Sequence, residues 1–121
     1  MAERALQSMT VEEFFEWQLD QQDRYELVDG FPVKMMTGAS DVHDAIVVNV
    51  ILALGSQLRG KPCRAATADL AVRTRIKGIR RGDVIVNCAP LKGDIYEAEQ
   101  PRLVVEVLSK SNTGIEWQRK L

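Results

Sequence analysis

Two carboxylates stand beside apolar runs of the kind that forms buried strands. Asp83 opens the run "DVIVNCA", and Glu106 interrupts the run "LVVEVLS" between two valines. Burying an unpaired carboxylate is costly, so each side chain needs a cation, a basic partner or hydrogen-bond donors nearby. If the two strands are neighbours, both carboxylates could hold one Mg²⁺ or Mn²⁺, because such ions take one or two carboxylates together with water and phosphate oxygens.

A purely structural arrangement accounts for the same two residues. Asp83 would cap a turn at Gly82, and Glu106 would pair with an arginine such as Arg73 or Arg102. Two acids separated by about 23 positions form no specific motif by themselves. Their spacing therefore leaves the metal site and the structural pairing as open alternatives.

His43 is the only histidine of the chain. Histidine serves in acid–base chemistry and as a metal ligand, which makes it a candidate for a functional site. It lies between Asp41 and Asp44 at the start of a predicted helix. A capping or surface role is the alternative for a histidine in that place.

A basic run without any acid, "RTRIKGIRR", ends two residues before Asp83. On a hairpin beside an acidic site, these side chains could bind the phosphates of a nucleic acid. The alternative is a solvated basic turn. The five basic residues are Arg73, Arg75, Lys77, Arg80 and Arg81.

Length and charge set the bounds within which these residues act. The 121 residues suit one domain, and 45% apolar with 27% charged residues is ordinary for a globular protein. Lysine and arginine number 16 against 17 acids, for a net charge of −1. The whole molecule therefore generates no field that attracts nucleic acid, and any DNA contact must be local.

The cysteines and the apolar segments bear on the compartment. Cys63 and Cys88 have neither the spacing of a zinc site nor that of a disulfide framework, so we expect reduced thiols, with Cys88 in the core. The start of the chain lacks a signal-peptide pattern, and no apolar run is long enough to suggest a membrane span. These features predict a cytoplasmic protein without a membrane partner.

The N-terminal third predicts a helix followed by a hairpin. Thr10 and Glu13 have the spacing of a capping box, which predicts a helix to about Gln21. The dipeptide Asp29-Gly30 is a strong tight-turn signal inside "RYELVDGFPVKMMTGAS". That segment should therefore form a β-hairpin.

The remaining sequence predicts a long helix and three strands. The helix begins at a cap on Ser40 or Asp41 and stops at Gly60, and it is apolar enough to pack on a sheet. The strand candidates are "CRAATADLAVRTRI", "GDVIVNCA" and "RLVVEVLS", of which the last two are apolar on both faces like central strands. A final helix begins near Ser111 or Asn112. This order predicts a single α+β (mixed α/β) domain over residues 1–121.

Several of these stretches, in this order, resemble one known family. "RYELVDG", the later "GDVIV" and "PRLVVEVLSKSN" are similar to the Uma-two family of restriction endonucleases, within the PD-(D/E)XK nuclease superfamily. The resemblance implies a restriction-endonuclease-like core, a central mixed sheet flanked by helices. It also implies a metal-dependent endonuclease that hydrolyses DNA phosphodiester bonds with Mg²⁺ or Mn²⁺.

The resemblance assigns roles to individual positions. Asp83 and Glu106 match the acidic metal ligands of the family. Leu108 occupies the place where the superfamily usually carries lysine, and Lys120 matches a lysine on the following helix that takes over that role. Such a lysine would orient the attacking water or stabilise charge at the scissile phosphate.

Two further positions match polar residues expected to line the same pocket, namely Glu26 and His43. The chain also departs from the family pattern. Gly82 replaces a usual proline before the aspartate, and Glu116 stands where aspartate is common. Family members continue beyond Lys120, so the domain is expected to be truncated at its C-terminus.

Two function classes and an assembly state follow from the sequence. The first class is a metal-dependent DNA endonuclease, and the alternative is a non-catalytic interaction or regulatory domain that retains a nuclease-like fold. A helix cut short would leave apolar surface exposed, so we expect a homo-oligomer in which Trp117 and Leu121 are partly covered.

Overall fold

The computed structural model describes residues 7–35, 38–75 and 77–108. The elements formed by these residues are, in chain order, α2 (Val11–Leu19), β1 (Tyr25–Val28), β2 (Phe31–Lys34), α3 (Asp41–Leu58), β3 (Arg64–Thr67), β4 (Val72–Arg75), β5 (Gly78–Arg80), β6 (Val84–Asn87) and β7 (Pro101–Val105). The predicted α+β class is confirmed, and the arrangement is consistent with a restriction-endonuclease-like fold.

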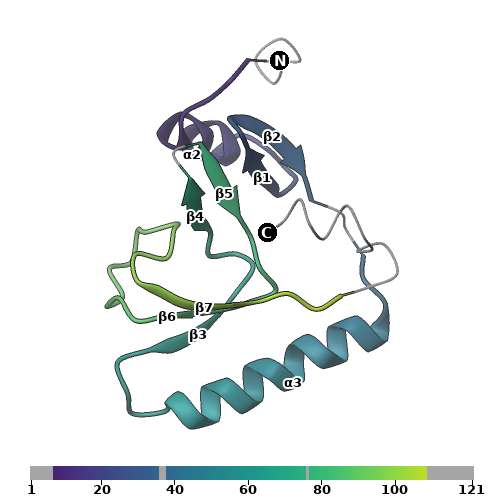
Figure 1. Cartoon of the computed structure of the whole chain (residues 1–121), viewed down its shortest axis with the longest axis vertical. Helices are drawn as coiled ribbons and strands as arrows, with labels where there is room; N and C mark the ends of the chain where they lie inside the picture. Colours follow the sequence, from purple (N-terminus) through teal and green to yellow (C-terminus); the bar gives the residue numbers. More distant parts are fainter. Residues whose placement is uncertain (1–6, 36–37, 76, 109–121) are drawn as a thin grey trace.

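The strands are arranged in two sheets. One has the order β2-β1-β5-β4 and the other the order β3-β6-β7, and the strand pairs within both sheets of the described chain are antiparallel. Helix α2 lies beside the first sheet, whereas α3 runs along the second, against β3 and β6 (Figure 1). The chain segment between β5 and β6 crosses from one sheet to the other, and it contains Arg81, Gly82 and Asp83.

Helix α2 is held at its start by the predicted capping box. The Thr10 hydroxyl accepts a hydrogen bond from the Glu13 backbone, and the Glu13 carboxylate accepts one from the Thr10 backbone. The helix ends at Leu19, slightly earlier than predicted. Its buried residues, Val11 and Phe14, belong to the core under the first sheet.

The hairpin β1–β2 turns at the predicted dipeptide. Asp29 and Gly30 both have positive φ, 52° and 88°, which suits a two-residue hairpin turn. Gly30 is also crowded, because a Cβ there would collide with the Ser8 hydroxyl. Its N–H donates to Lys77 O (2.9 Å) and its carbonyl accepts from Met9 N (2.7 Å). The turn therefore ties the hairpin to the chain on either side of it.

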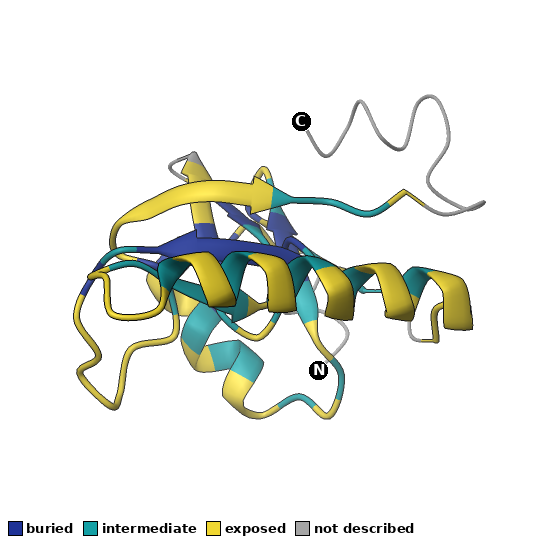
Figure 2. Cartoon of the chain, turned by 90° about the horizontal axis from the view of Figure 1, so that it is seen from below, coloured by how far each residue is buried: buried dark blue, intermediate teal, exposed yellow. Residues whose placement is uncertain are grey.

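The central strand of the second sheet is β6, and all four of its residues are buried. Strand β7 differs from its prediction as a central strand, since within the described chain it is an edge strand with exposed Leu103 and Val104. The strand also ends at Val105, so Glu106 follows it rather than interrupting it. Apolar composition predicted a buried strand, but β7 is largely exposed (Figure 2).

The segment "CRAATADLAVRTRI" does not form the single predicted strand. It divides into β3 and β4, which belong to different sheets, with a turn at Thr67–Leu70 where Leu70 N donates to Thr67 O (3.1 Å). Strand β5 then pairs with both β4 and β1. The turn residues, rather than the apolar pattern, decide where the chain changes sheet.

Helix α3 has the predicted cap, since the Ser40 hydroxyl accepts from His43 N (3.1 Å), and Gly60 follows its end with a φ of 79°. In the described part of the chain, no residue of α3 is buried. By length and composition alone, this helix could cross a membrane. That finding corrects the expectation that no apolar segment reaches such a length, although the helix here lies against β3 and β6.

The expectation of reduced thiols is wrong for this structure, because Cys63 and Cys88 form a disulfide. The register of β3 and β6 explains the pairing. Arg64 lies opposite Asn87, so the preceding and following residues meet across the strand ends. The two cysteines are 25 positions apart, and sequence spacing alone gives no sign of this contact.

Candidate functional site

The two predicted acids lie at the same end of the second sheet. Val84 pairs with Val105 in the antiparallel register of β6 and β7. Asp83 immediately precedes Val84, and Glu106 immediately follows Val105. Antiparallel pairing therefore brings residues that are far apart in the sequence to adjacent positions where both strands end.

Asp83 is held by the segment after β7 and lies close to α3. Its Oδ2 accepts a hydrogen bond from Val107 N (2.7 Å) and lies 3.5 Å from His43 Nε2. The structural alternative predicted that Asp83 caps a turn at Gly82. Instead, Asp83 accepts a hydrogen bond from the segment that follows β7. The Asp83 side chain is about a quarter exposed, with a fractional exposure of 25%. It is accessible to a small ligand.

His43 contributes to this site from the first turn of α3. Its Nε2 lies 3.0 Å from Val107 O. A carbonyl oxygen only accepts, so this contact requires a hydrogen on Nε2 that is donated to Val107. The serine cap of α3 fixes the backbone of His43, and the ring in turn fixes the chain that carries Glu106.

The Glu106 carboxylate lies near the backbone of Gly82, the residue before Asp83. A Cβ at position 82 would be 3.8 Å from Glu106 Oε1 and only 2.5 Å from Val104 Cγ1. A side chain at this position would therefore collide with β7. The absence of a Cβ lets the chain entering β6 approach β7 closely beside Asp83, where the resemblance led us to expect proline.

The donor set fits a cation of the Mg²⁺ type. Val107 N donates to Asp83 Oδ2, and Glu106 supplies a second carboxylate from the adjacent position. Within residues 7–35, 38–75 and 77–108, no group of three or more histidine, cysteine, aspartate or glutamate side chains could hold a metal. Two carboxylates with water and substrate oxygens are the ordinary coordination of Mg²⁺ in enzymes of phosphate chemistry.

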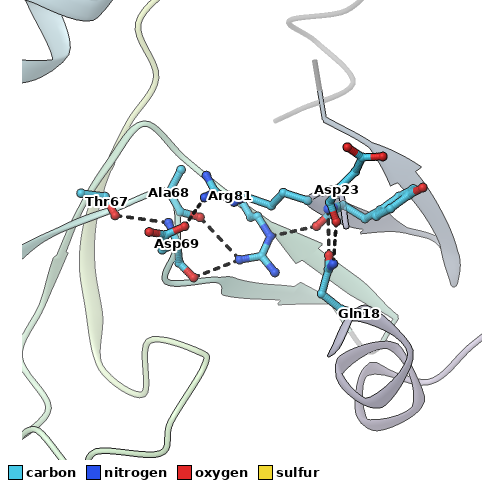
Figure 3. A network of polar contacts seen from close by, with 8 residues as sticks. Gln18, Asp23, Thr67, Ala68, Asp69 and Arg81 are labelled. Atoms are coloured by element: carbon cyan, nitrogen blue, oxygen red, sulfur yellow. Dashed lines mark hydrogen bonds and ion pairs between the residues drawn. The ribbon is translucent and has the colours of Figure 1, made fainter. Parts of the chain in front are cut away.

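Glu26 is linked to this site through the backbone of Arg81. Glu26 is buried on β1, and its Oε2 accepts from Arg81 N (2.8 Å). The Arg81 side chain is buried as well, and it donates to Tyr25 O (2.8 Å). It also donates to Asp69 O (3.0 Å), as Figure 3 shows. Burial lowers the pKa of Arg81 and is reinforced by the nearby Arg24, whereas Asp69 and Glu26 raise it.

Comparison with known proteins assigns the chain to a family. The model of the Uma2 family, described as "Putative restriction endonuclease", matches residues 11–121. The chain belongs to the Uma2 family. A relative from Synechocystis sp., an uncharacterized protein, is 30% identical over 105 residues, covering 85% of this chain and 55% of the relative. The Uma2 chain therefore spans about half the length of that relative, and the family resemblance inferred from the sequence is confirmed.

Several side chains of the basic run of this Uma2 chain contact other parts of the protein. Arg73 Nη2 contacts Glu97 (2.8 Å) and Glu12 (3.2 Å), and the hydrogen bond with Glu97 is the main cause that raises the pKa of Arg73. Lys77 Nζ donates to Ser8 Oγ (2.8 Å). Together with buried Arg81, these contacts give the run a structural function; the sequence suggested an ion pair for Arg73, but with Glu106 rather than with Glu97 and Glu12.

Some predicted residues of the Uma2 site cannot be placed. Lys120 and Glu116 lie outside the described residues. The same holds for Trp117 and Leu121, which were predicted to be covered in an oligomer, and for the side chain of Arg75. Leu108, at the position where the superfamily usually has lysine, is exposed. The structure thus brings together Asp83, Glu106 and His43, with Glu26 adjoining through Arg81.

Proposed function

We propose that this Uma2 protein is a metal-dependent endonuclease that hydrolyses DNA phosphodiester bonds, with Mg²⁺ or Mn²⁺ held by Asp83 and Glu106. Family membership supports the nuclease class. The observation that carries the proposal is the meeting of both acids and His43 at one end of β6 and β7. A bound cation would supply positive charge for the phosphate and promote ionisation of the attacking water.

The residues around the acids position them for this role. The hydrogen bond from Val107 N holds Oδ2 of Asp83, and His43 Nε2 lies 3.5 Å from the same oxygen, so the Asp83 carboxylate is restrained in direction. The donation from His43 to Val107 O restrains the segment that carries Glu106. Both acids are thereby pre-oriented before a cation or substrate binds, which lowers the entropy cost of binding.

Other residues complete the proposal through the family pattern. Lys120 would orient the nucleophilic water or stabilise charge on the scissile phosphate. The buried Glu26 would act indirectly, because its carboxylate holds the Arg81 backbone two residues before Asp83. Basic residues before the site would contact DNA phosphates. Of these, Lys77 is exposed and Arg80 is half-buried.

Cleavage of a supercoiled plasmid in the presence of Mn²⁺ or Mg²⁺ tests the proposal. We expect Asp83→Asn and Glu106→Gln to lower the cleavage rate by at least about 100-fold, since each removes a charged ligand. Asp94→Asn is the matched control, because Asp94 is an exposed acid on the connection between β6 and β7. Equal activity in all three variants would identify a contaminating nuclease and refute the assignment.

Metal binding provides a second readout that does not depend on turnover. Titration with Mn²⁺, followed by electron paramagnetic resonance, should show a site in the parent and in Asp94→Asn that is lost in Asp83→Asn. If the parent binds neither Mn²⁺ nor DNA, the chain is better described as a non-catalytic interaction domain. The exposed Leu108 in place of lysine is the observation that favours this second function.

A further inference from the structure

Helix α3 has an apolar face that points away from the sheet. Its residues recur at intervals of three and four, the spacing of one helix face, and all are exposed (Figure 2). Val42, Ile46 and Leu52 keep 64%, 42% and 61% of their surface accessible. We call this surface the outer face of α3, and it consists of the polar Asn49 at its centre and the apolar Val42, Ala45, Ile46, Leu52 and Ala53.

The opposite side of the helix already has its partner. His43, Val47 and Leu54 are half-buried where α3 lies against β3 and β6. A helix that covers a sheet normally presents charged residues outward, but α3 has none between Asp44 and Arg59. An exposed apolar stripe of this length is typical of a surface that another molecule covers.

We propose that a second copy of this chain covers the outer face, with the two α3 helices antiparallel about a two-fold axis at Asn49. Apart from Val42, the positions of this face are symmetric about that residue. Ile46 would face Leu52 of the second copy, and Ala45 would face its Ala53. A two-fold interface needs one surface that complements itself, and this pattern meets the requirement. The small alanines permit the close approach of two packed helices.

Charge complementarity favours a second copy over other partners. Asp41 and Asp44 lie in the first turn of α3, whereas Arg59 and Lys61 follow its end. In the antiparallel pair, the acidic end of each helix lies beside the basic end of the other. At a rise of about 1.5 Å per residue, Asp41 comes within roughly 3 Å, along the axis, of Arg59 of the second copy. Two such pairs form at each interface.

The interface is independent of the proposed nuclease function. His43 lies on the side of α3 that faces the sheet, so the candidate site stays open when the outer faces pair. Loss of the dimer and loss of catalysis are therefore separable. A variant of the outer face can be tested without altering the residues that bind the cation.

Light scattering coupled to size-exclusion chromatography tests this surface in the full 121-residue chain. We expect the mass of a dimer, and Ile46→Lys combined with Leu52→Lys should raise the dissociation constant by at least about 100-fold. Val48→Lys is the matched control, because Val48 is an exposed valine of α3 lying roughly 100° around the helix from Asn49. Circular dichroism must show that all variants remain folded.

Charge reversal identifies the partner and the orientation. Asp41→Arg should weaken the dimer by about tenfold, and Arg59→Asp in the same chain should restore it, since the opposite charges then meet again. A chain that stays monomeric at all concentrations overturns the proposal, whether or not it binds vesicles of anionic lipid. A dimer that is insensitive to Ile46→Lys and Leu52→Lys overturns it as well, because another surface would then be used.

Discussion

The buried guanidinium of Arg81 offers the sharpest test of how this structure is held together. Its side chain donates to Tyr25 O on β1 at 2.8 Å and to Asp69 O in the turn after β3 at 3.0 Å, with a longer contact of 3.5 Å to Ala68 O (Figure 3). One side chain thereby connects the first sheet, the turn that leads to it, and the segment entering β6. We consider the substitution Arg81→Met, which retains an apolar stem and removes every donor.

The expected cost follows from these contacts. Each of the two shorter hydrogen bonds involves a charged donor, and leaving its carbonyl unsatisfied costs about 1–3 kcal/mol. Removing the buried charge offsets part of this loss of stability, because burial disfavours the charged form of Arg81 and lowers its pKa. We therefore expect Arg81→Met to reduce the free energy of unfolding by about 3 kcal/mol.

Urea denaturation at neutral pH measures this change directly. Arg102→Met is the matched control, because Arg102 is an exposed arginine on the edge strand β7 and should change stability by less than about 0.5 kcal/mol. The free energy of unfolding should fall with urea concentration at the same slope in both variants, so that their midpoints can be compared.

The opposite result would have a clear meaning. If both Arg81→Met and Arg102→Met lowered the free energy of unfolding by less than about 0.5 kcal/mol, the network around Arg81 would not stabilise the protein. Arg81 would then be available for the phosphate contact that the sequence predicts. In that case the variant would weaken DNA binding while leaving the urea midpoint unchanged.

Three further outcomes are expected. Mg²⁺ at about one hundred times its dissociation constant should stabilise the protein by roughly 2.7 kcal/mol and raise its melting temperature, and an increase that persists in Asp83→Ala would contradict the metal site. Gly82→Ala places a Cβ 2.5 Å from Val104 Cγ1, so the free energy of unfolding measured in urea should fall by about 1–3 kcal/mol, and an unchanged urea midpoint would refute this packing. The Cys63–Cys88 bond closes a loop of 25 positions and should contribute about 3.5 kcal/mol, so a thiol reductant should lower the melting temperature of the parent but not of Cys88→Ser.

Much of the local structure was predictable because its causes lie within a few residues. The capping box of Thr10 and Glu13 and the turn at Asp29-Gly30 formed as predicted. Each depends on a side chain bonded to a nearby backbone group, or on the backbone conformation that a residue tolerates. The proximity of Asp83 and Glu106 was also predictable, given that their strands pair.

Other features depended on contacts between distant segments. The sequence did not indicate that residues 64–75 divide between two sheets, nor that β7 lies at an edge in the described chain. Apolar composition reports that a strand can be buried, but it does not specify its neighbours. Hydrogen-bond pairing across the sheets made those choices.

The sequence by itself determined the types of chemistry available in this protein: two carboxylates, one histidine and a basic run at defined positions. Only the tertiary structure decided how they are used. It placed His43 beside Asp83, joined Cys63 to Cys88, and gave the guanidinium of Arg81 buried carbonyl partners where the sequence predicted DNA phosphates. The physical reason is that a charged or reactive side chain takes its function from the groups that folding brings within a few ångströms, and these come from segments far apart in the chain.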